Sequence, residues 1–95
     1  MPTYEHLADS YIDGRWQPNH GTARIAVVDP STEQTIAELV AADAVDVDRA
    51  VAAARAAFPA MAASSVAQRI DWLQRLEAGF HARKEDLCQA MAVEM

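Results

Sequence analysis

Residues 11–16 read Tyr-Ile-Asp-Gly-Arg-Trp, a pattern typical of a tight β-hairpin. The pair Asp13-Gly14 stands between two short stretches of residues that favour strands. Both central positions of a type I′ turn need a positive φ, which glycine accepts freely and aspartate tolerates. The sequence therefore predicts a hairpin that reverses the chain at residues 13 and 14.

A second hairpin is predicted after a polar loop at residues 17–22. Apolar and β-branched residues dominate residues 25–28 and 35–40, which we interpret as two short strands. The segment between them, Asp-Pro-Ser-Thr-Glu, supplies the turn. Pro30 fixes φ for a first central position, and the Asp29 carboxylate can accept backbone hydrogen bonds.

A change of apolar period, from about 2 residues to about 3.6, indicates that a helix begins at Asp46. Asp46 is expected to be the N-cap of this helix. One helix face carries most of the apolar side chains, which are Val47, Ala50, Val51, Ala54 and Phe58. Pro59 is expected to end the helix at residue 58, because its ring disfavours helical geometry in the preceding residue.

Two further amphipathic helices are predicted, over about residues 66–80 and 82–95. The first has a capping box, in which Ser65 accepts from the first turn and Gln68 reaches back. Its apolar stripe, with Trp72 on the flank, consists of Val66, Ile70, Leu73, Leu76 and Phe80. The apolar side of the last helix is formed by Leu87, Cys88, Met91 and Met95.

The helical stripes need a surface to pack on, and the two hairpins offer little. Isolated two-stranded units are marginally stable in water, so they make a poor platform for three helices. We therefore expect the stripes to pack on a body supplied by residues beyond Met95, where the sequence stops without a helix-terminating signal.

Composition disfavours several classes of partner. Eight basic and 14 acidic residues give a net charge of −6, and no basic stripe is interleaved with aromatic residues, which disfavours nucleic-acid binding. No apolar run approaches the roughly 20 residues that span a bilayer, and the N-terminus lacks the pattern of a secretory signal. The single cysteine allows no internal disulfide. We expect a cytoplasmic protein that binds neither nucleic acid nor membrane.

Three residues are of types that often take part in catalysis, but we do not interpret them as catalytic. Cys88 lies within a helix beside Leu87 and Met91, so we expect an inert, buried thiol. Glu94 is interpreted as a solvated residue at a helix end, and Lys84 as surface charge.

No metal or phosphate site is predicted either. The histidines are widely separated and lack partners at metal-ligand spacing: His6, His20 and His81. An acidic cluster lacks the central glycine and distal glutamate of a calcium loop, and is expected to cap and stabilise a helix N-terminus: Asp43, Asp46 and Asp48.

The three glycines form no Gly-x-Gly-x-x-Gly pattern: Gly14, Gly21 and Gly79. The tryptophans Trp16 and Trp72 are interpreted as packing residues.

The order of these segments resembles the first part of an aldehyde dehydrogenase. The resemblance covers residues 11–95 and is carried by Tyr-Ile-Asp-Gly-Arg-Trp at 11–16, Asp-Pro-Ser-Thr-Glu at 29–33, the alanine-rich segment 46–58, Arg69 and Glu-Met at 94–95. It implies an α/β fold in which residues 1–95, with hairpins at about 10–40, form the N-terminal part of an NAD(P)-binding domain.

The resemblance also implies an activity for a longer parent chain. Such enzymes oxidise an aldehyde to a carboxylic acid with NAD or NADP through a cysteine thiohemiacetal, usually as homodimers or homotetramers. The family's catalytic cysteine, general-base glutamate and cofactor-contacting lysine lie in later motifs, so these roles do not pass to Cys88, Glu94 or Lys84. We expect a segment without catalytic, cofactor-binding, metal-binding or oligomerisation residues, whose partner is the rest of the parent.

The alternative is a small, acidic, helical interaction module without enzymatic activity. Its capped amphipathic helices would dock into a groove of a partner protein. This hypothesis leaves the two hairpins unexplained.

Overall fold

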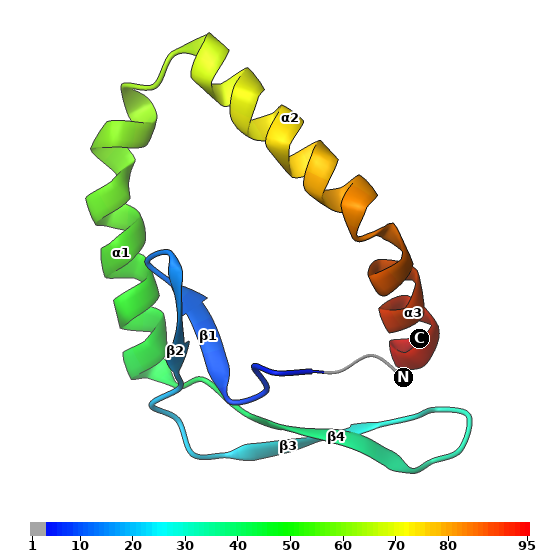
Figure 1. Ribbon diagram of the computed structural model, residues 1–95. Coiled ribbons are helices and arrows are strands. Elements are labelled where there is room, and N and C mark those ends of the chain that lie inside the picture. Colours follow the sequence, from blue (N-terminus) through cyan, green and yellow to red (C-terminus); the bar gives the residue numbers. More distant parts are fainter. Residues whose placement is uncertain (1–3) are drawn as a thin grey trace. The chain divides into compact units, whose positions relative to one another are not determined.

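The computed structural model describes residues 4–95, which form two β-hairpins followed by three helices (Figure 1). The chain divides into two compact units, with the boundary between Ala57 and Phe58. Both hairpins belong to the first unit, and the last two helices belong to the second. The predicted order of elements is therefore confirmed.

The first hairpin pairs strand β1 (Asp9–Ile12) with strand β2 (Arg15–Pro18) in antiparallel fashion. Ile12 lies opposite Arg15, which leaves a two-residue turn. The φ angles are 55° at Asp13 and 75° at Gly14, as a type I′ turn requires. The turn predicted from the Asp-Gly pair is confirmed.

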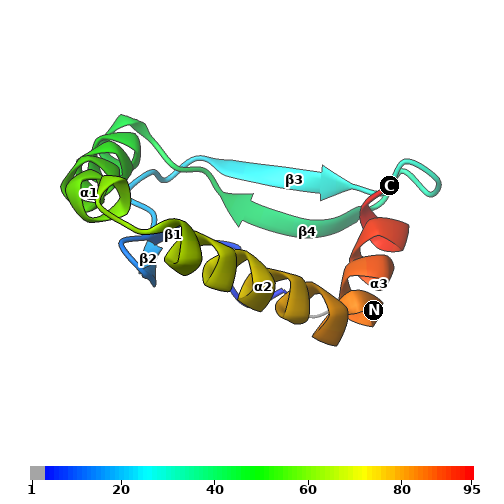
Figure 2. The ribbon, with the colours of Figure 1, turned by 90° about the horizontal axis from the view of Figure 1, so that it is seen from above.

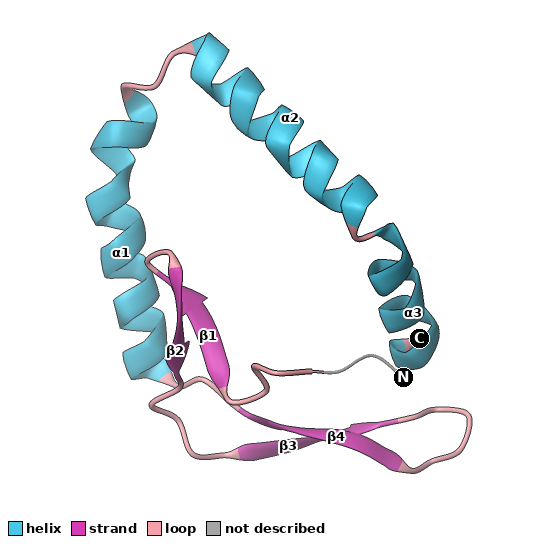
Figure 3. Cartoon of the chain, in the orientation of Figure 1, coloured by secondary structure: helices cyan, strands magenta, loops and turns pink. Residues whose placement is uncertain are grey.

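The second hairpin pairs β3 (Arg24–Val28) with β4 (Thr35–Val40), as a separate two-stranded sheet (Figure 3). Its turn closes where the Glu33 N–H donates to the Asp29 carbonyl at 2.8 Å. The Asp29 side chain accepts from the Ser31 N–H at 2.8 Å, as predicted. The end of β4 is joined to the segment that precedes β1 by a hydrogen bond from the Val40 N–H to the Leu7 carbonyl, at 2.9 Å.

Helix α1 (Ala44–Ala62) begins earlier than the sequence predicts. The Asp43 carbonyl accepts the first helical hydrogen bond from the Val47 N–H at 3.1 Å, and its side chain accepts from the Val45 N–H at 3.0 Å. Asp43 is therefore the N-cap, and the prediction that Asp46 caps the helix is wrong. Asp46 lies in the first turn instead.

Pro59 lies inside α1 and does not end it, so that prediction is also wrong. Proline removes only its own donor, while its carbonyl still accepts from the Ala63 N–H at 3.1 Å and so closes a last turn. The carbonyl that loses its partner is that of Arg55, an exposed residue at which water can take over.

The predicted capping box opens helix α2 (Val66–Ala82). The Ser65 hydroxyl accepts from the Gln68 N–H at 3.1 Å, and the Gln68 side chain accepts from the Ser65 N–H at 2.8 Å. Arg83 separates α2 from α3 (Lys84–Glu94), and the chain changes direction there (Figure 2).

Burial is sparse throughout the described part of the chain. Among residues 4–95 only Ile12 and Asp46 are buried, at 8% and 3% exposure. The predicted apolar stripe of α2 is 50–65% exposed at every position: Val66, Ile70, Leu73, Leu76 and Phe80. Full burial of one such side chain stabilises a protein by roughly 1.5–3 kcal/mol. Helix α2 obtains little of that stabilisation here.

Replacing Pro59 tests the position of the α1 C-terminus. We expect Pro59→Ala to stabilise the last turn by roughly 1–3 kcal/mol, because a backbone donor and a better helix former are restored. Amide exchange at residues 60–63 should slow and helical ellipticity should rise. Ala60→Gly is the control that should act in the opposite direction. If neither observable responds to Pro59→Ala, the helix ends before Pro59 in solution.

Candidate functional site

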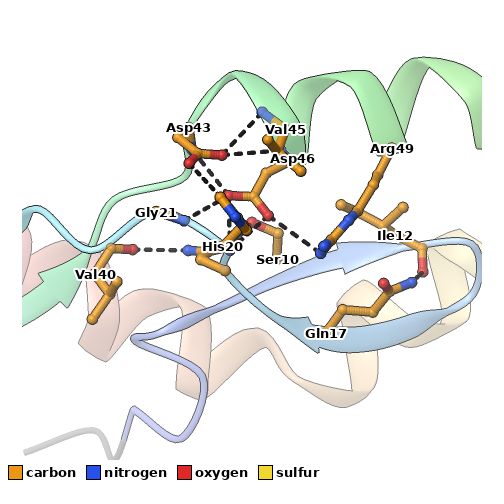
Figure 4. Close-up of polar contacts among 11 residues, drawn as sticks. Ser10, Ile12, Gln17, His20, Gly21, Val40, Asp43, Val45, Asp46 and Arg49 are labelled. Carbon is orange, nitrogen blue, oxygen red and sulfur yellow. Dashed lines mark hydrogen bonds and ion pairs between the residues drawn. The ribbon is translucent and has the colours of Figure 1, made fainter.

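The Asp46 carboxylate is the centre of the polar network in residues 4–57 (Figure 4). It accepts the His20 N–H at both oxygens, at 2.9 and 3.0 Å. The Gly21 N–H donates to Oδ2 at 3.2 Å, and the Asp43 N–H donates to the same oxygen at 2.9 Å. One carboxylate therefore satisfies three backbone donors from two segments that are distant in sequence.

Locally, the arrangement is a capping box built from two aspartates. Asp43 is the N-cap of α1 and Asp46 occupies the third helical position. The Asp46 side chain accepts the Asp43 N–H, and Asp43 Oδ1 accepts the Asp46 N–H at 3.3 Å. This reciprocal pairing is the one that Ser/Thr and Glu/Gln make in the usual capping box.

These hydrogen bonds lower the pKa of Asp46. The N–H of His20 contributes most and that of Asp43 next, while desolvation opposes them, and the pKa moves from 3.8 to about 2. Donors that bind the ionised form favour it, which accounts for the direction. Separately, the Arg49 guanidinium lies 3.7 Å from Asp46 Oδ1, as an ion pair one turn along α1.

The loop held by Asp46 is also tied to both hairpins. Ser10 Oγ donates to Asn19 Oδ1 at 2.6 Å, and Asn19 Nδ2 donates to the Val40 carbonyl at 2.8 Å. His20 Nδ1 lies 2.6 Å from Asp43 Oδ2, so the side chain of the loop histidine reaches the helix cap as well. Residues 19–21 thus join the first hairpin, the end of β4 and the start of α1.

Position 21 requires glycine, because the backbone of residues 41–43 passes too close to leave room for a side chain. A Cβ atom added there would collide with the Ala41 carbonyl oxygen and would lie 3.1 Å from both Ala42 C and Asp43 N. Any side chain would push the loop away from the segment that leads into α1. Polarity and composition identified 17–22 as a loop but did not reveal this contact.

We call this network the Asp46 joint, because it holds the loop at residues 19–21 against the start of α1. The backbone N–H groups of the joint already have acceptors within the chain. The backbone N–H groups at the start of α1 point at carboxylates that belong to the same chain. The N-terminus of a helix attracts anions, but here two negative side chains occupy that position. The predicted capping role of the acidic cluster is confirmed for Asp43, and Asp46 is an acidic residue of the first helical turn rather than the cap. Asp48 is exposed on α1.

The structure corrects the interpretation of Cys88. Its thiol is exposed on α3, so the predicted buried environment is wrong for the described chain. Leu87 and Met91 are themselves 41% and 54% exposed, which means that the apolar side of α3 gives Cys88 no enclosure. Lys84 and Glu94 are exposed on the same helix.

The other two histidines, His6 and His81, lie apart from the network that contains His20. His6 Nδ1 is 2.9 Å from Asp9 Oδ2, and its ring stacks on Trp16 with centroids 4.0 Å apart and planes at 4°. His81 Nε2 lies 3.7 Å from Glu77 on α2. Within residues 4–95 no group of three or more His, Cys, Asp or Glu side chains is arranged to hold a metal ion.

Two glycines provide a matched test of the joint. Gly21→Ala should lower the urea midpoint of residues 4–57, because the new Cβ meets backbone atoms that cannot move independently. Gly79→Ala adds the same atom where nothing lies within 4 Å, and should stabilise α2 by up to about 1 kcal/mol. Equal shifts for the two variants would contradict the close approach at Gly21.

The lowered pKa of Asp46 gives a second test, read from amide exchange of His20 and Gly21. The pKa is lower in the folded state than its ordinary value of 3.8, so the contribution is present above that pH and is lost as the pH falls towards about 2. Protection of both amides should decrease across this window. Asp46→Asn should show weak protection at every pH. The same pH response in Asp46→Asn would exclude Asp46 as its cause.

Comparison with known proteins agrees with this architecture. The sequence profile of the aldehyde dehydrogenase family matches residues 16–95. Two Staphylococcus aureus proteins whose names refer to aldehyde dehydrogenase, from strains bovine RF122 / ET3-1 and USA300, are 33% and 32% identical over 85 residues, which is 90% of this chain and 18% of theirs.

A solved structure matches the fold over nearly the whole chain. It is a mutant of aldehyde dehydrogenase C from Pseudomonas syringae, in complex with NAD+ and octanal. It aligns with a TM-score of 0.90 and 42% identity over 95% of this chain and 19% of that one. This chain thus spans about a fifth of the length of these relatives.

The match confirms the expected fold of two hairpins and three helices as an aldehyde dehydrogenase N-terminal portion. Among residues 4–95 no helix is long and apolar enough to cross a membrane. Because the family profile covers most of its residues, this chain belongs to the aldehyde dehydrogenase family.

Proposed function

We propose that residues 1–95 are the N-terminal part of an enzyme subunit that oxidises an aldehyde to a carboxylic acid with NAD+ or NADP+. The observation that carries this proposal is the 42% identity and TM-score of 0.90 with an aldehyde dehydrogenase in complex with NAD+ and octanal. That protein is several times longer, so the catalytic apparatus is assigned to the remaining part of the parent.

The starts of α1 and α2 offer a dinucleotide phosphate few free donors, which supports a structural role for these two helix ends. At the start of α1 a phosphate would meet the carboxylates of Asp43 and Asp46, and like charges repel. The start of α2 is closed by the Ser65 and Gln68 side chains. We therefore propose that the nucleotide is bound by the remaining part of the parent.

The covalent chemistry is likewise assigned outside this segment. In the proposed reaction a cysteine thiolate would attack the aldehyde to give a thiohemiacetal, and loss of a hydride to NAD+ or NADP+ would oxidise this adduct to a thioester. A base-activated water would then hydrolyse the thioester, which releases the acid and restores the thiolate. Cys88 is exposed on α3. We propose that residues 1–95 catalyse nothing alone, and that the parent is a cytoplasmic homodimer or homotetramer.

The test is an assay of the full parent chain. With octanal as the probe, we expect NAD+- or NADP+-linked oxidation by the parent and none by the 95-residue chain. Each nucleotide is supplied separately, and formation of its reduced form is followed by absorbance. A folded parent that oxidises neither octanal nor other aldehydes with either nucleotide would overturn the proposed activity.

Cys88→Ser in the parent separates this thiol from the proposed nucleophile. We expect kcat/KM within about twofold of the unchanged parent, because Cys88 touches no reacting group in the proposal. Loss of turnover in a variant that remains folded would contradict the assignment of catalysis to residues outside this segment.

A further inference from the structure

The turn of the first hairpin brings together two groups that the fold does not use. Asp13 and Gly14 are both exposed, and they form the single Asp-Gly pair of the sequence. Among residues 4–95, neither the Asp13 carboxylate nor the Gly14 N–H takes part in a hydrogen bond. The carboxyl carbon and the neighbouring amide nitrogen are therefore both open to attack and to water.

We propose that Asp13 is a site of spontaneous isomerisation to isoaspartate. The Gly14 nitrogen attacks Asp13 Cγ, and a carboxyl oxygen leaves as water together with the amide proton, which closes a succinimide ring. Water then adds to the main-chain carbonyl carbon of Asp13 and breaks its bond to the Gly14 nitrogen. The chain is now linked through Cγ. One water is released and one is consumed, so no other reactant is needed.

Glycine at position 14 leaves room for this attack. It has no Cβ to hinder the approach of its nitrogen to Cγ, and a Cβ built there would meet nothing within 4 Å. Every other aspartate of the sequence precedes a residue that carries a side chain. Asp29 precedes Pro30, whose nitrogen has no proton to lose, so this pair is an internal blank.

Opening of the turn is expected to set the rate. The φ angles of 55° and 75° hold Asp13 and Gly14 in a type I′ turn, and ring closure needs a rotation about the Asp13 Cα–C bond that this turn does not permit. Opening is a local event, because an isolated two-stranded unit is only marginally stable. The aromatic pair on its surface, Tyr11 and Trp16, is 62% and 50% exposed.

Isomerisation would also prevent the hairpin from closing again in its original form. The Cβ of Asp13 enters the main chain, so the loop becomes one atom longer. The register, in which Ile12 lies opposite Arg15, depends on a two-residue turn. The hydrogen bond from Gln17 Nε2 to the Ile12 carbonyl, at 2.8 Å, crosses the same turn. We therefore expect faster amide exchange in β1 and β2 once Asp13 has isomerised.

The test incubates the full parent at neutral pH in water enriched in oxygen-18 and then digests it in ordinary water. Trypsin should release residues 1–15, since Arg15 is the first basic residue. Electron-transfer fragmentation of this peptide distinguishes isoaspartate from aspartate. We expect isoaspartate and one oxygen-18 atom to accumulate at Asp13, while Asp29 stays unlabelled.

Two variants separate the chemistry from the opening of the turn. Gly14→Asn keeps a residue that tolerates positive φ but adds a side chain, and should slow labelling by at least about fivefold. Tyr11→Ala removes the edge-to-face contact with Trp16, whose ring centroid lies 5.3 Å away, and should accelerate labelling.

Three outcomes would overturn the proposal. Asp13 could stay unlabelled in the parent after a synthetic peptide of residues 9–18 has converted. Asp13 and Asp29 could gain label equally, or Gly14→Asn could react as fast as the unchanged parent. An unchanged rate in Tyr11→Ala would refute control by turn opening. These readouts need no aldehyde or nucleotide, so their result is independent of the proposed function.

Discussion

The first part of this chain depends on a single buried carboxylate. Asp46 gathers the N–H groups of His20, Gly21 and Asp43, which come from a loop and from a helix start separated by more than 20 residues. Apolar burial contributes little here, since Ile12 is the only buried hydrophobic residue among residues 4–95. Backbone donors that lose a partner inside a protein are costly. The charged acceptor at Asp46 therefore does, for residues 4–57, what an apolar core does in larger domains.

The second unit, from Phe58 to Met95, has exposed apolar helix surfaces in place of a buried polar network. Helices α2 and α3 contain no buried residue, although their sequences are amphipathic. This contrast fits a segment that spans about a fifth of its relatives. Its own polar network fixes the hairpins and the direction in which α1 leaves them, and its apolar helix face is available to a larger body. The acidic cap of α1 also explains why this helix start is unsuited to a nucleotide phosphate.

Local signals in the sequence predicted most of the fold. The Asp13-Gly14 turn, the Asp29 turn and the Ser65–Gln68 capping box each involve residues close in sequence, and all three are present. The start of α1 was misplaced because Asp43-Ala44-Val45-Asp46 is itself a capping box, with aspartates where serine and glutamine are usual. Spacing of the two aspartates could have revealed it.

Contacts between distant residues were not predictable in the same way. Nothing near Asp46 in the sequence points to His20 or Gly21, and the need for glycine at position 21 arises only when the segment at 41–43 approaches it. The most direct test of the Asp46 joint is a hydrogen-bond scalar coupling from the amide nitrogens of His20 and Gly21 to the Asp46 carboxyl carbon. We predict that both couplings are observed at neutral pH. Their absence, together with unprotected His20 and Gly21 amides, would contradict the account.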